Sequence, residues 1–187
     1  MLVLHPGDYA SSRDDIVLCT VLGSCISVVL YDKVLGYGGM NHFMLPFSSR
    51  SPDVLSEDGK YGVNAMELLI NDMMKKGSNR FDLQAKVFGG GHVLHTIPMG
   101  ASVAKVPENN IAFAMDFLKK EGFPIVSSDV GEDYGRKIFL FTASGKVLLK
   151  RLRGHQVEIV VREEDAWGQT LTNVPPKNGV VLFNELQ

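Results

Sequence analysis

The chain has 187 residues, of which 45% are hydrophobic and 21% charged, an ordinary composition for one globular domain. Its formal net charge of −2 argues against a nucleic-acid-binding protein, which would usually carry a basic face. No apolar run approaches the ~18 residues of a membrane span, and the N-terminus lacks the features of a signal peptide. Two cysteines are too few for a disulfide scaffold. We therefore expect a cytoplasmic protein without membrane insertion.

Short β-prone segments and two amphipathic segments alternate along the chain. Apolar residues at helical spacing predict one helix over residues 64–76, with Asn64 as its N-cap, and a second over 110–121. Strands are predicted at residues 15–19, 26–31, 36–45, 85–88, 125–129, 137–142, 146–152 and 155–161. Two long helices among many short strands predict an α+β fold.

Two polar stretches are predicted to lie outside this core. Residues 44–60 are rich in Ser, Asp and Pro and predict a surface loop, which either borders a substrate groove or lies passively on the surface. Near its C-terminus the chain turns polar and carries two adjacent prolines. We therefore expect one domain over residues 1–161 and a C-terminal extension over 162–187 that its chemistry does not need.

One predicted hairpin brings a cysteine and a histidine together. If the chain folds back at residues 32–35, Tyr31 lies opposite Gly36, and the same antiparallel register places Cys25 opposite His42. Directly opposed side chains point to one face, with Cβ atoms roughly 4.5–5.5 Å apart. The thiol and the imidazole are then within reach of a shared proton.

A cysteine beside a histidine suits nucleophilic catalysis, because the imidazole can take the thiol proton and hold a thiolate–imidazolium pair. The backbone N–H groups of Ser24 and Cys25, which follow Gly23, could then stabilise an oxyanion. A third group usually orients the histidine, and Thr20, Ser24 and Asn41 are local candidates. Since a cysteine in an apolar strand is more often a packing residue, this pattern leaves catalysis and packing as open alternatives.

Two other motifs carry weak functional signals. His92 and His95 form an H-x-x-H pair without a third ligand at useful spacing, so we expect a solvated loop and no metal site. The three glycines at 89–91 lack the Lys-Ser/Thr pair of a phosphate-binding loop and predict a tight exit from a strand.

The cysteine lies in the motif TVLGSCISVVLYD and the histidine in GYGGMNHFMLP. These motifs, and more weakly KYGVNAMELLI, AKVFGGG, DVGEDYGRKIFL and GKVLLKRL, resemble the CheD family of chemoreceptor glutamine deamidases. The resemblance covers roughly residues 5–153. It implies a single α+β domain in which two packed β-sheets carry flanking helices, an α/β/β/α-like arrangement.

The resemblance also implies an activity: a cysteine hydrolase that converts selected glutamines of methyl-accepting chemotaxis receptors to glutamate and releases ammonia, with no cofactor. Cys25 matches the nucleophile and His42 the general base. The third family residue is a threonine shortly before the cysteine. It matches Thr20, which we favour, or Cys19 at an alternative offset.

The implied partners are the cytoplasmic helices of chemoreceptors. An alternative function is binding and regulating a CheC-like phosphatase, with weak or no hydrolase activity. Two segments depart from the family pattern. Gly131-Glu132 stands ahead of Arg136 where many members have two glycines, and residues 99–110 look altered, although Asn110 matches a family asparagine. If these segments shape the substrate groove, receptor selection differs.

Overall fold

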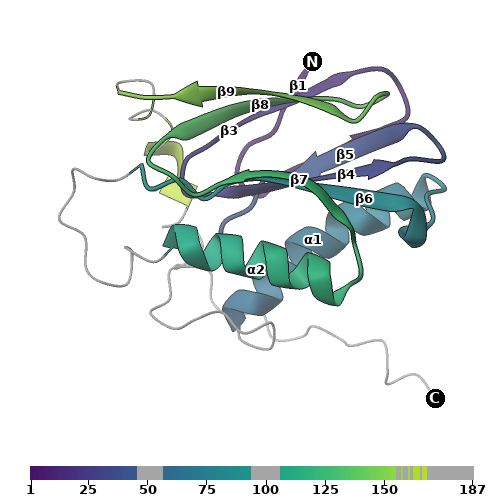
Figure 1. Ribbon diagram of the computed structural model, residues 1–187, viewed down its shortest axis with the longest axis horizontal. Coiled ribbons are helices and arrows are strands. Elements are labelled where there is room, and N and C mark those ends of the chain that lie inside the picture. Colours follow the sequence, from purple (N-terminus) through teal and green to yellow (C-terminus); the bar gives the residue numbers. More distant parts are fainter. Residues whose placement is uncertain are drawn as a thin grey trace.

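The computed structural model describes residues 1–45, 57–93 and 106–154, together with Val157, Val160, Arg162, Glu163, Glu164, Ala166 and Trp167. Two β-sheets pack face to face, and both long helices lie on the outer side of one sheet (Figure 1). The predicted α+β fold with two packed sheets is confirmed. Because both long helices cover the same sheet, the layers run helix, sheet, sheet.

The first sheet has the strand order β1-β3-β8-β9 and the second the order β2-β5-β4-β6-β7. The strands are β1 Leu2–Val3, β2 Tyr9–Ser12, β3 Val17–Leu22, β4 Ile26–Asp32, β5 Tyr37–Asn41, β6 Leu83–Gly89, β7 Ile125–Val130, β8 Gly135–Phe141 and β9 Lys146–Leu152. The helices are α1 Glu57–Lys75, the short 3-10 helix η1 Arg80–Asp82, and α2 Val106–Lys120.

Strand β4 lies in the middle of the five-stranded sheet and is buried on both faces. Ile26, Val28 and Leu30 pack toward the helices, in the core cluster that contains their apolar faces. Val29 and the preceding Cys25 point the other way, into the space between the two sheets. A strand covered on both sides has a continuous apolar sequence, which explains why this segment lacks alternation.

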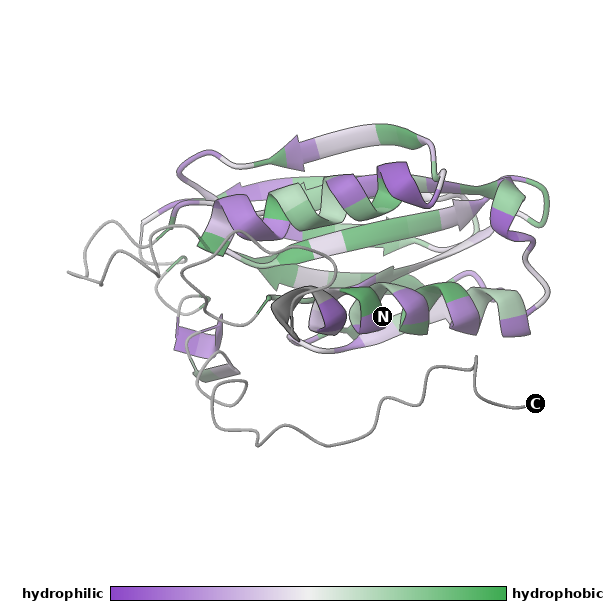
Figure 2. Cartoon of the chain, turned by 90° about the horizontal axis from the view of Figure 1, so that it is seen from below, coloured by the Kyte–Doolittle hydropathy of each residue, from purple (hydrophilic) through white to green (hydrophobic). Residues whose placement is uncertain are grey.

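The two long helices are amphipathic, and Figure 2 shows hydrophilic and hydrophobic bands alternating along each of them. Helix α1 begins at Glu57 rather than at Asn64, so the predicted N-cap is wrong and the last part of the predicted loop is helical. Met44 and Leu45, predicted as the start of that loop, are buried, and residues 46–56 lie outside the described residues. No helix in the described ranges is long and apolar enough to cross a membrane.

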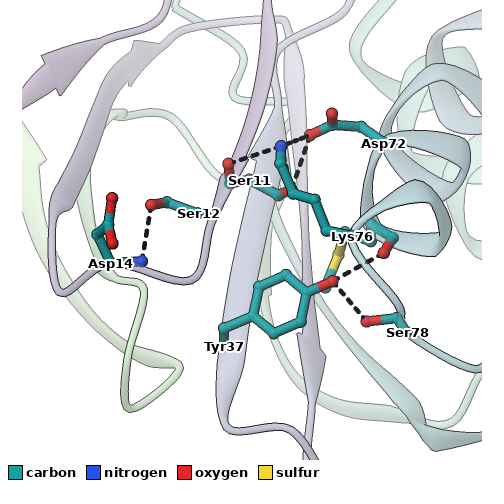
Figure 3. Close-up of polar contacts among 8 residues, drawn as sticks. Ser11, Ser12, Asp14, Tyr37, Asp72, Lys76 and Ser78 are labelled. Carbon is teal, nitrogen blue, oxygen red and sulfur yellow. Dashed lines mark hydrogen bonds and ion pairs between the residues drawn. The ribbon is translucent and has the colours of Figure 1, made fainter.

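The C-terminal end of α1 is fastened to the five-stranded sheet by polar contacts (Figure 3). The hydroxyl of Ser11 on β2 donates to Asp72 at 2.7 Å, and the ammonium group of Lys76 donates to the same carboxylate at 2.6 Å. The hydroxyl of Tyr37 on β5 donates to the carbonyl of Met73 and accepts from Ser78. These bonds hold the helix over the strand that leads to His42.

The register of the hairpin between β4 and β5 differs from the prediction. Tyr31 pairs with Gly38, two residues beyond the predicted partner Gly36. The predicted opposition of Cys25 and His42 is therefore wrong. Because side chains alternate along a strand, a shift of two residues leaves both on the same face.

An aspartate at the turn causes this shift. One carboxylate oxygen of Asp32 accepts hydrogen bonds from the N–H groups of Val34 and Leu35, both at 2.8 Å. The N–H of Gly36 returns to the carbonyl of Asp32, and Gly36 adopts a φ of 69° that favours glycine. Asp32 thus stays in the strand, and the turn occupies residues 33–36.

The predicted strand at 155–161 is wrong, because Val157 and Val160 have helical backbone. Both side chains are buried against Leu152 and contact the half-buried Val21 and Val93. A spacing of three residues places them on one face of a helix, and that face covers the end of the four-stranded sheet.

A buried arginine ties β7 to β8. The side chain of Arg136 is fully buried; its Nε donates to Asp129 at 2.6 Å and its Nη1 to the carbonyl of Tyr134 at 3.1 Å. Burial by itself raises the pKa of Asp129, but the hydrogen bond and charge of Arg136 outweigh that effect and lower the pKa. The ion pair therefore holds Asp129 in its charged form.

Asp129→Asn is expected to lower the free energy of unfolding by about 2–3 kcal/mol, because it leaves the guanidinium buried without a countercharge. The expected loss is below that of a fully buried pair, since Asp129 is 24% exposed. Urea denaturation measures it. The exposed Asp133→Asn is the matched control and should stay within about 0.5 kcal/mol of wild type; equal losses in the two variants would contradict the assignment.

Candidate active site

Three buried side chains meet between the two sheets. Thr20 comes from the inner face of β3, Cys25 from the loop before β4, and His42 from the residue after β5. Ligand atoms of Cys25 and His42 lie within 4.8 Å of each other, and the hydroxyl of Thr20 lies 2.8 Å from Nδ1 of His42. The structure thus brings together the three residues singled out from the sequence.

The hydrogen bonds of Thr20 assign the tautomer of His42. The Thr20 hydroxyl donates its proton to the carbonyl of Leu4 at 2.8 Å, so its oxygen accepts from Nδ1–H of the imidazole. Nε2 then carries the lone pair, and this buried atom has no hydrogen-bond partner among the described residues. It is the imidazole atom available to take a proton from Cys25.

Cys19 lies on the opposite face of β3 from Thr20, as the alternation of side chains requires. It is buried, and burial raises the pKa of its thiol while the nearby Lys137 opposes that rise. The hydroxyl of Thr20, and not the thiol of Cys19, therefore contacts His42.

Burial decides the charge of the cysteine and the histidine. It lowers the pKa of His42 to about 4, against the opposing charge of Glu164. It also raises the pKa of Cys25 well above its ordinary value, and the negative charge of Glu164 and a hydrogen bond to that carboxylate add to the rise. Both shifts favour a neutral thiol beside a neutral imidazole over the thiolate–imidazolium pair, because the dry interior penalises both charges.

Residues 23–25, which we call the cysteine loop, are held through all three of their backbone carbonyls. The carbonyl of Gly23 accepts from the N–H of Gly91 at 2.7 Å, that of Ser24 from Nδ2 of Asn110 at 2.9 Å, and that of Cys25 from the N–H of Gly90 at 2.7 Å. The glycines at 89–91 thus lie against the loop, where a side chain at Gly89 would come within 2.1 Å of the Cys25 carbonyl.

The N–H groups of the cysteine loop converge on the carboxylate of Glu164. Gly23 and Cys25 donate to one oxygen at 2.7 and 3.1 Å, while the N–H and hydroxyl of Ser24 donate to the other at 2.7 and 2.8 Å. The Glu164 side chain is buried. The N–H groups of Ser24 and Cys25, expected to bind an oxyanion, are therefore bound to an anion of the chain itself.

Glu164 was not predicted as a site residue, because it falls in the segment 162–187 that was expected to be an extension. A signal existed: Val157, Val160 and Glu164 share the spacing of one helix face. The domain boundary at residue 161 remains a prediction, but the segment beyond it reaches the cysteine.

Within the described residues, Cys25, His42 and Glu164 form a group whose ligand atoms lie close enough to hold a metal ion. Both oxygens of Glu164 already accept two hydrogen bonds each from the cysteine loop, with which a metal ion would have to compete. A cysteine ligand must also be deprotonated, whereas burial and Glu164 raise the pKa of Cys25. These three residues are thus better suited to hydrogen bonding with the cysteine loop than to binding a metal ion.

In the H-x-x-H pair, His92 contacts Glu108 at 3.3 Å, and the second histidine lies outside the described residues.

Comparison with known proteins relates the amino-acid sequence of this chain to a family. The profile described as CheD chemotactic sensory transduction matches residues 44–151. The probable chemoreceptor glutamine deamidase CheD 1 of Shewanella oneidensis is 40% identical over 181 residues, which cover 96% of this chain and 86% of that protein. Its counterpart in Herminiimonas arsenicoxydans is 42% identical over 180 residues, 96% of this chain and 87% of that protein.

Among solved structures, the chain shows a partial likeness to Bacillus licheniformis hypothetical protein YfiH. The TM-score is 0.40 at 16% identity, over 65% of this chain and 50% of that one. The relatives that align along almost the whole chain show that this protein belongs to the CheD family.

Proposed function

We propose that this protein is a cytoplasmic chemoreceptor glutamine deamidase with Cys25 as its nucleophile. The observation that carries the proposal is the buried cluster of Cys25, His42 and Thr20 beside the N–H groups of the cysteine loop. The names of its relatives support the substrate class, since two of them at 40% and 42% identity are called probable chemoreceptor glutamine deamidases. The partner is then a cytoplasmic helix of a chemoreceptor.

The first half of the reaction forms a thioester. Nε2 of His42 takes the proton of the Cys25 thiol as the sulfur attacks the side-chain amide carbon of a receptor glutamine. The amide oxygen gains negative charge and accepts from the N–H groups of Ser24 and Cys25. The C–N bond then breaks, and His42 returns the proton to the departing nitrogen, which leaves as ammonia.

The second half consumes one water. His42 accepts a proton from that water, whose oxygen attacks the thioester carbon, and the C–S bond breaks. The proton returns to the sulfur, so Cys25 is again a thiol and the receptor carries a glutamate. Because burial keeps both resting groups neutral, the proton moves during the attack rather than before it.

Ammonia release from a purified receptor cytoplasmic fragment tests this function. We expect ammonia together with conversion of specific glutamines to glutamate, located by peptide mass spectrometry. The same assay with and without a CheC-like phosphatase checks the alternative of a binding partner. Turnover of small free amides with none on the receptor fragment would overturn the proposal.

Thr20→Val is expected to lower kcat by about 10-fold or more, equivalent to ~1.4 kcal/mol, because it removes the acceptor that holds Nδ1–H of His42. Thr20→Ser keeps the hydroxyl and should retain most of the activity. Cys19→Ser should leave kcat nearly unchanged and cost stability, since it buries a hydroxyl in place of a thiol. Steady-state ammonia release and thermal melts check these results; a harmless Thr20→Val with a crippling Cys19→Ser would reverse the assignment.

A further inference from the structure

The anion bound by the cysteine loop has the same chemistry as the product of the proposed reaction. A glutamate side chain ends in a carboxylate, and so does a deamidated receptor glutamine. Glu164 brings this group to the loop from a segment 139 residues away in sequence from Cys25. One of its oxygens lies within 4.8 Å of the ligand atoms of Cys25 and His42.

The loop is built to hold an anion. Its three carbonyls are tied down by Gly90, Gly91 and Asn110. The N–H groups of its residues therefore face a common point, as in the backbone concavities that bind anions. With the hydroxyl of Ser24, the loop directs four hydrogen-bond donors at its occupant, and three of them are backbone N–H groups that cannot accept.

Four donors distinguish a carboxylate from a carboxamide. A carboxylate offers two acceptor oxygens, and each receives two hydrogen bonds here. A carboxamide in the same place would set its NH2 group, which has no acceptor capacity, against the N–H groups of Gly23 and Cys25 or against the N–H of Ser24. The loop in this arrangement selects the product group over the substrate group.

The bound carboxylate also blocks the chemistry. It accepts from the same N–H groups that would stabilise the oxyanion, so a receptor glutamine cannot use them. Its charge and its hydrogen bond with the thiol raise the pKa of Cys25. Both effects disappear when the carboxylate leaves.

We propose that the cysteine loop is a carboxylate-binding site which Glu164 fills as an internal counterpart of the product, so that a receptor glutamine enters only after this glutamate is displaced. This inference rests on the proposed function for the identity of the substrate. The chain around Glu164 is held in place by more than its carboxylate: Val157 and Val160 are buried against the four-stranded sheet, and the ring of Trp167 packs against Gly7.

The rate at which iodoacetamide alkylates Cys25 in the full-length protein tests the inference without any receptor. Glu164→Gln keeps the size of the side chain but opposes an NH2 group to the loop donors, and Glu164→Ala removes the carboxylate. We expect both to raise the rate at neutral pH by about tenfold or more. The exposed neighbour Glu163→Gln is the matched control and should react like wild type. Peptide mapping separates Cys25 from Cys19.

An added carboxylate should refill the vacated site. We expect glutarate to slow the alkylation of Glu164→Ala and to leave wild type unchanged, and glutaramide to have a much weaker effect. Trp167→Ala, which loosens the segment without changing the loop, should also speed alkylation and serves if both Glu164 variants fail to fold. Folded Glu164 variants that react at the wild-type rate or slower, with no response to glutarate, would overturn the inference. Glu164 would then only stabilise the conformation of the loop.

Receptor deamidation separates this inference from the proposed function. Glu164→Gln is expected to raise kcat/KM on a receptor fragment. If alkylation responds as described but no variant deamidates receptor, the proposed function fails and the carboxylate site stands. If wild type deamidates receptor and Glu164→Gln lowers kcat/KM without faster alkylation, the proposed function stands and the inference fails.

Discussion

Cys25→Ala is expected to abolish deamidation of a receptor fragment while the protein stays folded. The variant has no sulfur to form the thioester, and the other cysteine lies on the far face of β3. Loss of a covalent nucleophile should reduce kcat by at least about 10⁴-fold, equivalent to ~5 kcal/mol. The change removes one atom from a small buried side chain, so the free energy of unfolding should fall by no more than ~1 kcal/mol.

Ammonia release and a thermal melt on the same preparation measure both quantities. Cys19→Ala is the matched control, because it removes the other thiol, which is also buried but lies on the outer face of β3, away from His42. It should keep full turnover. Full activity in a folded Cys25→Ala variant would end the mechanism, whatever the receptor specificity turned out to be.

His42→Gln is expected to be nearly inactive at neutral pH and to recover as the pH rises. Without the imidazole, attack depends on the fraction of Cys25 that ionises unaided. The pKa of Cys25 lies well above its ordinary value because of burial and Glu164, so that fraction is very small at pH 7. We expect a loss of about 10²–10⁴-fold at neutral pH, followed by a gain of about tenfold per pH unit up to the thiol pKa.

Wild type should behave differently. Burial lowers the pKa of His42 to about 4, so the imidazole stays neutral and able to accept a proton throughout the neutral and mildly alkaline range. Its activity should therefore be nearly flat there and fall only as the pH approaches that pKa. The pH profiles of kcat for the two proteins, measured over the range in which both remain folded, make the comparison. Parallel profiles would remove His42 from the role of general base.

The proximity of Cys25 and His42 could be predicted because it depends on parity rather than on exact register. The turn set by Asp32 moved the register by two residues, and an even shift keeps both side chains on one face. The same alternation means that only one of Cys19 and Thr20 can face His42; the family offset and the hydrogen-bonding capacity of a hydroxyl favoured Thr20. The hydrogen bond from Thr20 to the carbonyl of Leu4 could not be predicted, because every residue has a backbone carbonyl and the sequence does not distinguish this one.

Glu164 was missed for a different reason. The segment that leads to it was predicted as a strand at 155–161, and strand periodicity does not place Val157, Val160 and Glu164 on one face. Its contacts span 139 to 141 residues of sequence, so no local pattern links it to the cysteine. The glycines at 89–91 were correctly taken as a tight exit from a strand, but their hydrogen bonds to the cysteine loop were also out of reach of local reasoning.

The same long separations bear on the order of folding. The cysteine loop is fixed by Gly90 and Gly91, which follow β6, and by Asn110 on α2; all three come more than sixty residues after the loop along the chain. During synthesis, β4 and β5 can pair early because they are neighbours in sequence, whereas the loop must wait for these later elements. A ribosome-bound chain that ends before Asn110 therefore carries the thiol and the imidazole, but the N–H groups of its cysteine loop are not yet fixed in place. Cys25 is expected to reach its full reactivity only once the domain is complete.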